Sequence, residues 1–214
     1  TDHGGNPGLY DVTTKNWTLG PDLDPWLFLR NAETIINQGK LPAIDNMRNV
    51  PLGFDNSIES QLLPYMIVYT HKIINIFGNY PIEFSGALFP VLMFGLTIIS
   101  FFLFVRELFL IKTEKNFNKA NLIAIISTFF MIVVPVFLGR TVAGIPEKES
   151  AAFFFLFLSF YFLLKGWKTE KVKNGIFLGL ASGISTGLMA LVWGGVIYAF
   201  IPIALASLSA FILN

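Results

Sequence analysis

The sequence contains no cysteine, so disulfide bonds and thiolate metal sites are excluded. Charged residues are scarce as well: they make up 14% of the 214 residues, whereas a soluble domain carries about a quarter. The net charge of +1 gives no support to nucleic-acid binding. No signal peptide is visible, and because the first residue is Thr1 rather than methionine, we expect the chain to begin within a longer protein.

Apolar surface, in contrast, is in excess. Hydrophobic residues make up 54% of the chain and 23 residues are phenylalanine, which is more than a soluble fold hides from water. Five apolar stretches approach the roughly 20 residues that cross a bilayer. They are residues 82–110, 120–138, 150–167, 174–192 and 194–212. We therefore predict an all-α polytopic membrane protein with residues 81–214 as its transmembrane helical domain, whose last two stretches form a tight helical hairpin.

Residues 1–80 are polar to mixed and are predicted to form a large external loop with amphipathic or interfacial helices. The pair Asp24-Pro25 predicts a helix start, with aspartate as the N-cap and proline at the first helical position. Apolar residues then recur at helical spacing, and Gly39 is the expected stop. Such a helix is typical of one that lies at a membrane surface.

The distribution of lysine and arginine predicts the orientation. Residues 106–119 and 165–173 together carry eight basic and three acidic residues. Cytoplasmic loops are enriched in Lys and Arg, and these two loops fall on the same side when the spans are counted. We therefore expect the N-terminal region and the loop at residues 139–149 to be external.

Two acidic pairs share that external face, and each precedes an apolar helix. They are Asp22 with Asp24, and Glu147 with Glu149. Either pair alone is explained by helix capping or by the positive end of a helix dipole. Carboxylates that converge from two loops also suit a hard divalent cation, Mg²⁺ or Mn²⁺.

Three further features have two interpretations each. Arg140 is either an interfacial arginine or a phosphate clamp, because guanidinium binds phosphate oxygens in a bidentate way. Trp193 is favoured as an interfacial anchor, with substrate contact as its other role. The sequence Asn16-Trp17-Thr18 is an acceptor sequon for N-glycosylation, although such tripeptides also occur by chance.

Three motifs together resemble one family, the catalytic subunit of oligosaccharyltransferase, a dolichyl-phospho-oligosaccharide–protein glycosyltransferase of the GT-C class. DPWLFLR (24–30) is similar to the Asp-Pro-aromatic segment of the family's first external loop. GRTVAGIPEKES (139–150) is similar to an Arg-Thr/Ser-Val-Ala-Gly segment followed by an acidic-x-acidic motif. Trp193-Gly194-Gly195 matches a Trp-Gly-Gly at the start of a later span.

The resemblance implies a GT-C-type membrane domain that transfers a glycan from a dolichyl phosphate or diphosphate carrier to Asn in Asn-x-Ser/Thr sequences. Asp24, Glu147 and Glu149 would be the catalytic residues and the ligands of Mn²⁺ or Mg²⁺, and Asp24 would also touch the acceptor amide. Arg140 would lie near the carrier's phosphate. The implied partners are the lipid-linked donor, the acceptor polypeptide and membrane lipids. The implied location is the cell membrane or the endoplasmic reticulum membrane, with the active face external or lumenal.

The sequence also departs from the family. Glu147 stands where the family often has aspartate, and a later acidic loop and an acceptor-reading C-terminal domain are not in this sequence. We therefore expect an N-terminal fragment that is inactive alone. Two other functions remain open. Another GT-C enzyme that uses a polyprenyl-phosphate sugar, such as a protein O-mannosyltransferase, would share an external acidic pair. A transporter would carry charges near mid-membrane, and the five apolar stretches hold almost none.

Overall fold

The computed structural model describes residues 9–111 and 117–213, so the orientation argument for Lys112, Glu114 and Lys115 lies outside the described residues. The chain divides into two compact units. The first comprises the described residues up to Met93 together with Gly139–Ser150, and the second comprises those of Phe94–Leu138 and of Ala151–Asn214. The loop that carries Arg140 and Glu147 therefore belongs with the N-terminal region.

The first unit contains two short hairpins and two helices, followed by the start of a third helix. In β1 and β2 the chain pairs antiparallel, as it does in β3 and β4. The elements are β1 (Tyr10–Asp11), β2 (Asn16–Trp17), α1 (Leu23–Gln38), β3 (Ile44–Asp45), β4 (Phe54–Asp55), η1 (Asn56–Ile58), α2 (Leu62–Ile74) and the first turns of α3 (Ile82–Phe109). Helices α1 and α2 pack against each other.

Helix α1 begins two residues earlier than its sequence predicts. Asp22, not Asp24, is the N-cap, and its Oδ1 accepts a hydrogen bond of 2.7 Å from the N–H of Leu23. The prediction that Asp24 caps this helix is therefore wrong, since Asp24 lies inside the first turn. Pro25 is tolerated there because N–H groups of the first turn have no partner within the helix. The predicted stop is confirmed: Gly39 adopts φ 81° and donates to the carbonyl of Ile35.

A small apolar core joins α1 to its surroundings. Leu19, Leu29 and Ala87 are buried together, and Leu9 and Ile82 pack against them. The apolar face of α1 therefore packs against other parts of the protein in this structure.

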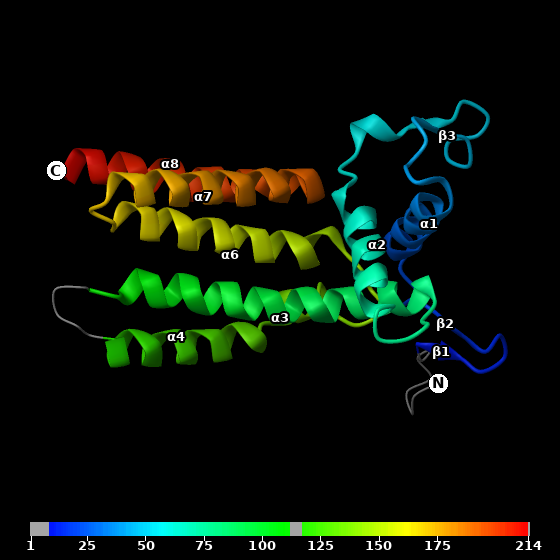
Figure 1. Cartoon of the computed structure of the whole chain (residues 1–214), viewed down its shortest axis with the longest axis horizontal. Coiled ribbons are helices and arrows are strands. Elements are labelled where there is room, and N and C mark those ends of the chain that lie inside the picture. The colour runs from blue at the N-terminus through cyan, green and yellow to red at the C-terminus, as the bar shows by residue number, and fades with distance from the viewer. Residues whose placement is uncertain (1–8, 112–116, 214) are drawn as a thin grey trace. The chain divides into compact units, whose positions relative to one another are not determined.

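The second unit is a helical bundle (Figure 1). It contains the rest of α3, α4 (Phe117–Ile132), α5 (Pro135–Gly139), most of α6 (Lys148–Trp167), α7 (Val172–Val192), η2 (Gly194–Val196) and α8 (Ile197–Leu213). In the described residues, four helices are long and apolar enough to cross a membrane: Ile82–Phe109, Lys148–Trp167, Val172–Val192 and Gly194–Leu213. The chain is an integral membrane protein.

The predicted span 120–138 is not one helix. Helix α4 is a shorter apolar helix that ends at Ile132, and α5 starts afresh at Pro135. Proline cannot donate a backbone hydrogen bond and its ring clashes with the preceding turn, which accounts for the break. That this segment crosses the membrane remains a prediction.

Aromatic and hydroxyl side chains connect the long helices of this unit. The ring of Phe157 on α6 meets that of Phe101 on α3 edge to face at 4.8 Å. Ser159 on α6 lies 2.7 Å from the hydroxyl of Thr186 on α7, and both are buried. Hydroxyl pairs of this kind satisfy polar groups where lipid offers no partner. Lys168 donates to backbone carbonyls at the end of α3, including that of Leu110 at 3.0 Å.

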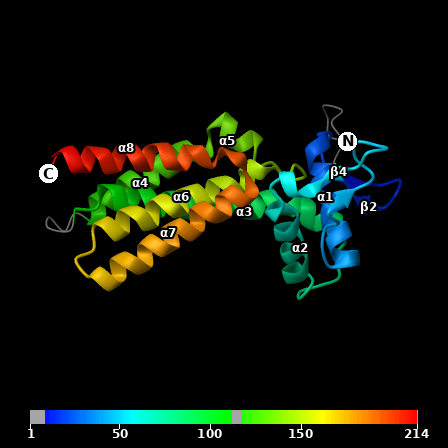
Figure 2. The ribbon, with the colours of Figure 1, turned by 90° about the horizontal axis from the view of Figure 1, so that it is seen from above.

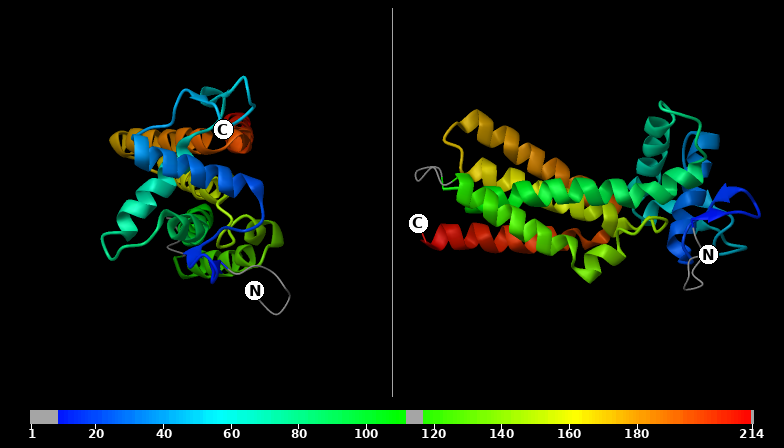
Figure 3. Two further views of the ribbon diagram at one scale, coloured as in Figure 1. Left: turned by 90° about the vertical axis from the view of Figure 1, so that its right-hand side faces the viewer. Right: turned by 90° about the horizontal axis from the view of Figure 1, so that it is seen from below.

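Helices α7 and α8 share a tight turn but do not stay together. From that turn they separate and lie on opposite sides of α6 (Figures 2 and 3). Trp193 occupies the turn in an extended conformation, and its ring stacks on Tyr198 with centroids 5.7 Å apart. A Cβ on Gly195 would lie 2.2 Å from that ring, so any other residue would force the indole to move. The predicted tight turn is present, but it does not form a closely packed helical hairpin.

Candidate functional site

The two predicted acidic motifs come together because backbone hydrogen bonds tie their loops. The N–H of Gly20, just before α1, donates to the carbonyl of Gly144 at 2.8 Å. The N–H of Gly144 donates in turn to the carbonyl of Ala87 in α3 at 2.9 Å. The loop that precedes α6 is thus held against the segment that precedes α1, and both loops belong to the first unit.

Gly144 is required by this arrangement for two reasons. Its φ of +83° is a conformation that residues with a Cβ rarely adopt. A Cβ on Gly144 would also lie 2.2 Å from Cδ2 of Leu9. The glycine of the Val-Ala-Gly segment therefore serves the close approach of the two loops.

Side chains support the same contact. The indole Nε1 of Trp26 donates to the carbonyl of Gly20 at 3.0 Å, which holds the loop before α1 against the helix itself. Lys148, the first residue of α6, places Nζ 5.5 Å from the ring centroid of Phe28 on α1. A cation over an aromatic face at this distance is attractive.

Glu147 is the buried member of the acidic group. Its side chain is 7% exposed, and its Oε1 lies 3.6 Å from Nη1 of Arg140, which is about half exposed. Burial, followed by the charge of Glu149, raises the pKa of Glu147 to about 7, and Arg140 acts against this rise. Asp22 and Asp24 add smaller contributions in the same direction. The other three predicted carboxylates therefore lie close enough to Glu147 to affect its pKa.

The start of α6 explains how Glu147 and Glu149 are oriented. The carbonyl of Glu147 accepts hydrogen bonds from the N–H of Ser150 at 3.1 Å and from its Oγ at 2.6 Å. Glu149 lies in the first turn of α6, where the helix dipole favours a negative charge. Asp22 and Asp24, at the start of α1, are exposed.

The carboxylates are the type of ligand that a divalent cation binds, but their side chains are not arranged around a common point. Oxygen donors of this kind are what Mg²⁺ and Mn²⁺ prefer, and a buried carboxyl crowded by others is stabilised by a cation. Within residues 9–111 and 117–213, no three His, Asp or Glu side chains are grouped closely enough to hold a metal ion. The side chains would have to turn toward one another to bind one.

Sequence reasoning missed one cation near this group. Arg48 binds both carboxylate oxygens of Glu59, at 2.9 and 3.1 Å, and its guanidinium lies 3.7 Å from the ring centroid of Phe54. The bond to Glu59 raises the pKa of Arg48, and the charge of Asp24 adds to that rise. A single arginine in a polar loop carries no sequence signal, so only the fold could reveal it.

Trp193, the remaining predicted site residue, belongs to the second unit, where its ring faces Tyr198. Its proposed contact with substrate therefore stays a prediction.

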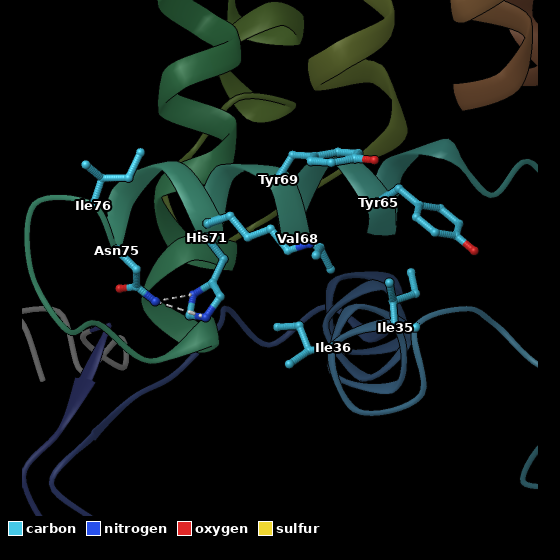
Figure 4. Close-up of a pocket in the computed structure, with 10 residues that line it drawn as sticks. Ile35, Ile36, Tyr65, Val68, Tyr69, His71, Asn75 and Ile76 are labelled. Carbon is cyan, nitrogen blue, oxygen red and sulfur yellow. Dashed lines mark hydrogen bonds between the residues drawn. The ribbon is translucent and has the colours of Figure 1, made fainter.

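A separate cavity of about 550 Å³ lies between α1 and α2 (Figure 4). Ile35 and Ile36 of α1 line one side, and on the other side His71 of α2 is hydrogen-bonded to Asn75, the residue that follows this helix. Nδ1 of His71 also lies 3.1 Å from Oγ of Ser85 on α3, and burial lowers the pKa of His71. This network links α2 to α3.

Four apolar helices long enough to cross a membrane, together with a polar N-terminal region that carries the acidic motifs, define a polytopic membrane protein. The chain matches the family described as "Oligosaccharyl transferase STT3, N-terminal" over residues 9–213. The chain belongs to this family, as its motifs predict.

Relatives and solved structures agree with that assignment. A dolichyl-phosphooligosaccharide-protein glycotransferase of Archaeoglobus fulgidus is 29% identical over 88% of this chain, and the stt3 subunit of Schizosaccharomyces pombe is 25% identical over 83%. The chain spans 28% and 22% of their lengths. The crystal structure of the A. fulgidus oligosaccharyltransferase with Zn and sulfate shares the fold, with a TM-score of 0.74 at 23% identity over 94% of this chain and 24% of that one.

A second A. fulgidus structure, of AglB with an inhibitory peptide and a dolichol-phosphate, has a TM-score of 0.71 at 24% identity and covers 91% of this chain and 22% of that one. The predicted all-α membrane fold is therefore confirmed.

Proposed function

We propose that the natural protein that carries this chain transfers an oligosaccharide from a dolichyl phosphate or diphosphate carrier to Asn of Asn-x-Ser/Thr sequences in exported proteins. One observation carries this proposal. Arg140 and the buried Glu147 are held beside the start of α1 by the Gly20–Gly144 hydrogen bond, within a chain that belongs to the STT3 family. The carrier and acceptor classes are supported by the dolichol-phosphate and the inhibitory peptide bound to the archaeal AglB.

The reaction joins the acceptor's amide nitrogen to the anomeric carbon of the glycan. The bond from that carbon to the carrier's phosphate oxygen breaks, and the phosphate leaves with the electron pair while the proton lost by the nitrogen passes to the leaving phosphate or to water. Arg140 binds the phosphate, since its half-exposed guanidinium offers paired donors. Asp24 accepts a hydrogen bond from the acceptor amide N–H. This bond makes the nitrogen lone pair more available for attack and stabilises the positive charge that develops on that nitrogen.

Asp24, Glu147 and Glu149 are the proposed ligands of a divalent cation, Mn²⁺ or Mg²⁺. The proposal is supported by the raised pKa of Glu147 and by the Zn bound to the A. fulgidus enzyme. When bound, the cation would neutralise the carboxylates and stabilise negative charge on the leaving phosphate. The chain's part is to hold the two loops that carry these carboxylates, at the starts of α1 and α6, against each other.

The active face is proposed to be external or lumenal. The lysines between α6 and α7 support a cytoplasmic position for that loop, so the loop before α6, at the other end of the same apolar helix, is proposed to lie on the opposite side. Single cysteines at Lys148 and Lys171 in a chain without native cysteine would be treated with an impermeant thiol reagent in intact cells. We expect labelling at position 148 alone, and equal labelling at both positions would refute the orientation.

The transfer itself is tested with the natural protein in membranes, a dolichyl-phosphate-linked oligosaccharide and a peptide that contains Asn-x-Thr. We expect glycopeptide that is lost when the peptide carries Gln in place of the sequon Asn. Transfer to a serine or threonine side chain of a peptide without a sequon would instead identify a protein O-glycosyltransferase.

A further inference from the structure

A second cavity, of about 530 Å³, lies along α1 and is not used by the carboxylates of the proposed reaction. It opens between α1, the β1–β2 hairpin and the start of α3. Its size is within the range of small-molecule sites. Two tryptophans, three carboxylates and an arginine dominate its lining: Trp17, Trp26, Asp11, Glu33, Glu83 and Arg30.

The two indole rings are held in place by their neighbours. Trp17 meets the rings of Tyr10 and Phe84 edge to face, with centroids 5.6 and 4.8 Å away. Trp26 is anchored through its hydrogen bond to Gly20, and 42% of it remains exposed. A fixed and partly exposed aromatic face binds an apolar ligand surface without losing much conformational freedom. The C–H face of a sugar ring is such a surface.

Polar groups complete the cavity at the edges of the rings. Arg30 and Glu33 follow Trp26 at helical spacing and so lie on the same face of α1. Glu83 comes from the first turn of α3 and accepts a hydrogen bond of 2.9 Å from Nδ2 of Asn16. Glu33 and Glu83 both line the cavity, and burial, followed by the charge of Glu83, raises the pKa of Glu33. Carboxylates are strong acceptors for the hydroxyl groups of a sugar.

The charges favour one class of sugar. Three carboxylates line the cavity, and its one lining arginine, Arg30, is already paired with Asp45. A uronic acid or another anionic sugar would meet like charge, which disfavours binding. A neutral sugar can use both the aromatic rings and the carboxylate acceptors.

We propose that this cavity is a subsite that holds a neutral sugar of the donor glycan while the transferred end reacts beside Asp24. The assignment as a donor subsite rests on the proposed transfer reaction. The lining runs along α1 from Trp26, two residues beyond Asp24, to Glu33, nine residues or about 13 Å beyond it along the helix axis, so the subsite extends to a sugar beyond the one bonded to phosphate. Sugars at this position add binding energy far from the reacting bond.

Binding is tested without any transfer, by saturation-transfer NMR on the natural protein in lipid nanodiscs. Nanodiscs are needed because maltoside detergents present sugar headgroups of their own. We expect saturation transfer to cellobiose but little to glucuronate. Trp17→Ala is expected to weaken cellobiose binding about tenfold, which corresponds to about 1.4 kcal/mol. The matched control Trp167→Ala, an exposed tryptophan of α6 outside this cavity, should leave binding unchanged.

A second variant covers the case in which Trp17→Ala disturbs the hairpin. Glu33→Gln keeps the size of the side chain and removes one carboxylate, so the preference for cellobiose over glucuronate should fall severalfold. Glu170→Gln, at an exposed position between α6 and α7, is the control and should keep the preference. Equal binding of cellobiose and glucuronate by the unmodified protein, or binding that neither pocket variant changes, would overturn the subsite.

A kinetic experiment separates this proposal from the transfer reaction. The unmodified protein is given dolichyl-phosphate carriers with either one hexose or a longer neutral chain. We expect a higher kcat/KM for the longer donor, and a ratio that falls toward one in Trp17→Ala and Glu33→Gln. An active enzyme whose variants keep the full ratio would refute the subsite and leave the transfer reaction standing. The protein could instead bind cellobiose in a way that depends on Trp17 and transfer nothing from either carrier. That outcome would refute the transfer reaction but would still support a sugar-binding site in this cavity.

Discussion

The amide of Gly20 and the carbonyl of Gly144 are 124 residues apart in sequence and joined by a hydrogen bond of 2.8 Å. This bond places the loop before α6 against the loop before α1. It is one of the contacts that join the segment before Glu147 to the segment before Asp24. The carbonyl of Ala87 extends the connection to α3 by accepting from the amide of Gly144.

Gly144→Ala is therefore expected to destabilise the protein by about 1–3 kcal/mol, through the strain of φ +83° and the contact of the new Cβ with Leu9. Thermal unfolding in nanodiscs would report it as a lower Tm. Gly183→Ala in α7 is the matched control, because a Cβ there meets nothing within 4 Å and alanine favours a helix. Equal Tm values for the two variants would contradict the close-approach argument.

The two aspartates at the start of α1 should behave differently. Asp22→Ala removes the cap on Leu23, so we expect a loss of about 1 kcal/mol in stability. Asp24→Asn leaves that cap intact and removes a negative charge, so stability should be near normal while glycopeptide formation falls strongly. Unfolding and transfer would be measured on the same preparations. Normal transfer by Asp24→Asn would argue against its role at the acceptor amide.

Arg140→Lys tests the proposed phosphate contact. Lysine keeps the positive charge near Glu147 but loses the planar pair of donors, so KM for the lipid-linked donor should rise while KM for the peptide stays constant. Arg106→Lys is the comparison, because Arg106 is hydrogen-bonded to Asn121 in the second unit. If the donor kinetics of Arg140→Lys were unchanged, Arg140 would be left with the role of an interfacial anchor only.

Glu147→Gln is expected to stabilise the metal-free protein at pH 8 and to weaken its binding of Mn²⁺. The pKa of Glu147 is raised from 4.5 to about 7, so the folded state binds more protons than the unfolded chain between these values. Stability of the metal-free protein should then fall as pH rises through this window, and the glutamine variant should lack that part of the loss.

Mn²⁺ offers a second measurement on the same pair of proteins. An ion that binds only the folded state raises Tm, so Mn²⁺ should stabilise the unmodified protein and should have little effect on Glu147→Gln. Glu170→Gln serves as the control and should respond to Mn²⁺ normally. The same Mn²⁺ response in Glu147→Gln would remove Glu147 from the proposed ligands.

The sequence by itself determined the helices and the family. Long apolar stretches predict α3, α6, α7 and α8, because a segment in lipid must satisfy its backbone groups internally and over about 20 residues. Gly39 was readable as the end of α1, since a left-handed cap is a local property of glycine. The Asp-Pro and Arg-Thr-Val-Ala-Gly motifs led to the family that residues 9–213 match.

Only the tertiary structure decided which of these residues meet and in what environment. The choice of Asp22 over Asp24 as cap depends on where the turn before α1 is held, and the burial of Glu147 depends on a bond between two distant glycines. The cavity beside Trp17 is built from three segments that share no local pattern. Propensity and hydropathy act over a few residues of one segment. Hydrogen bonds and packing between segments depend on how the whole unit folds, and that folding brings together the two loops that carry the carboxylates.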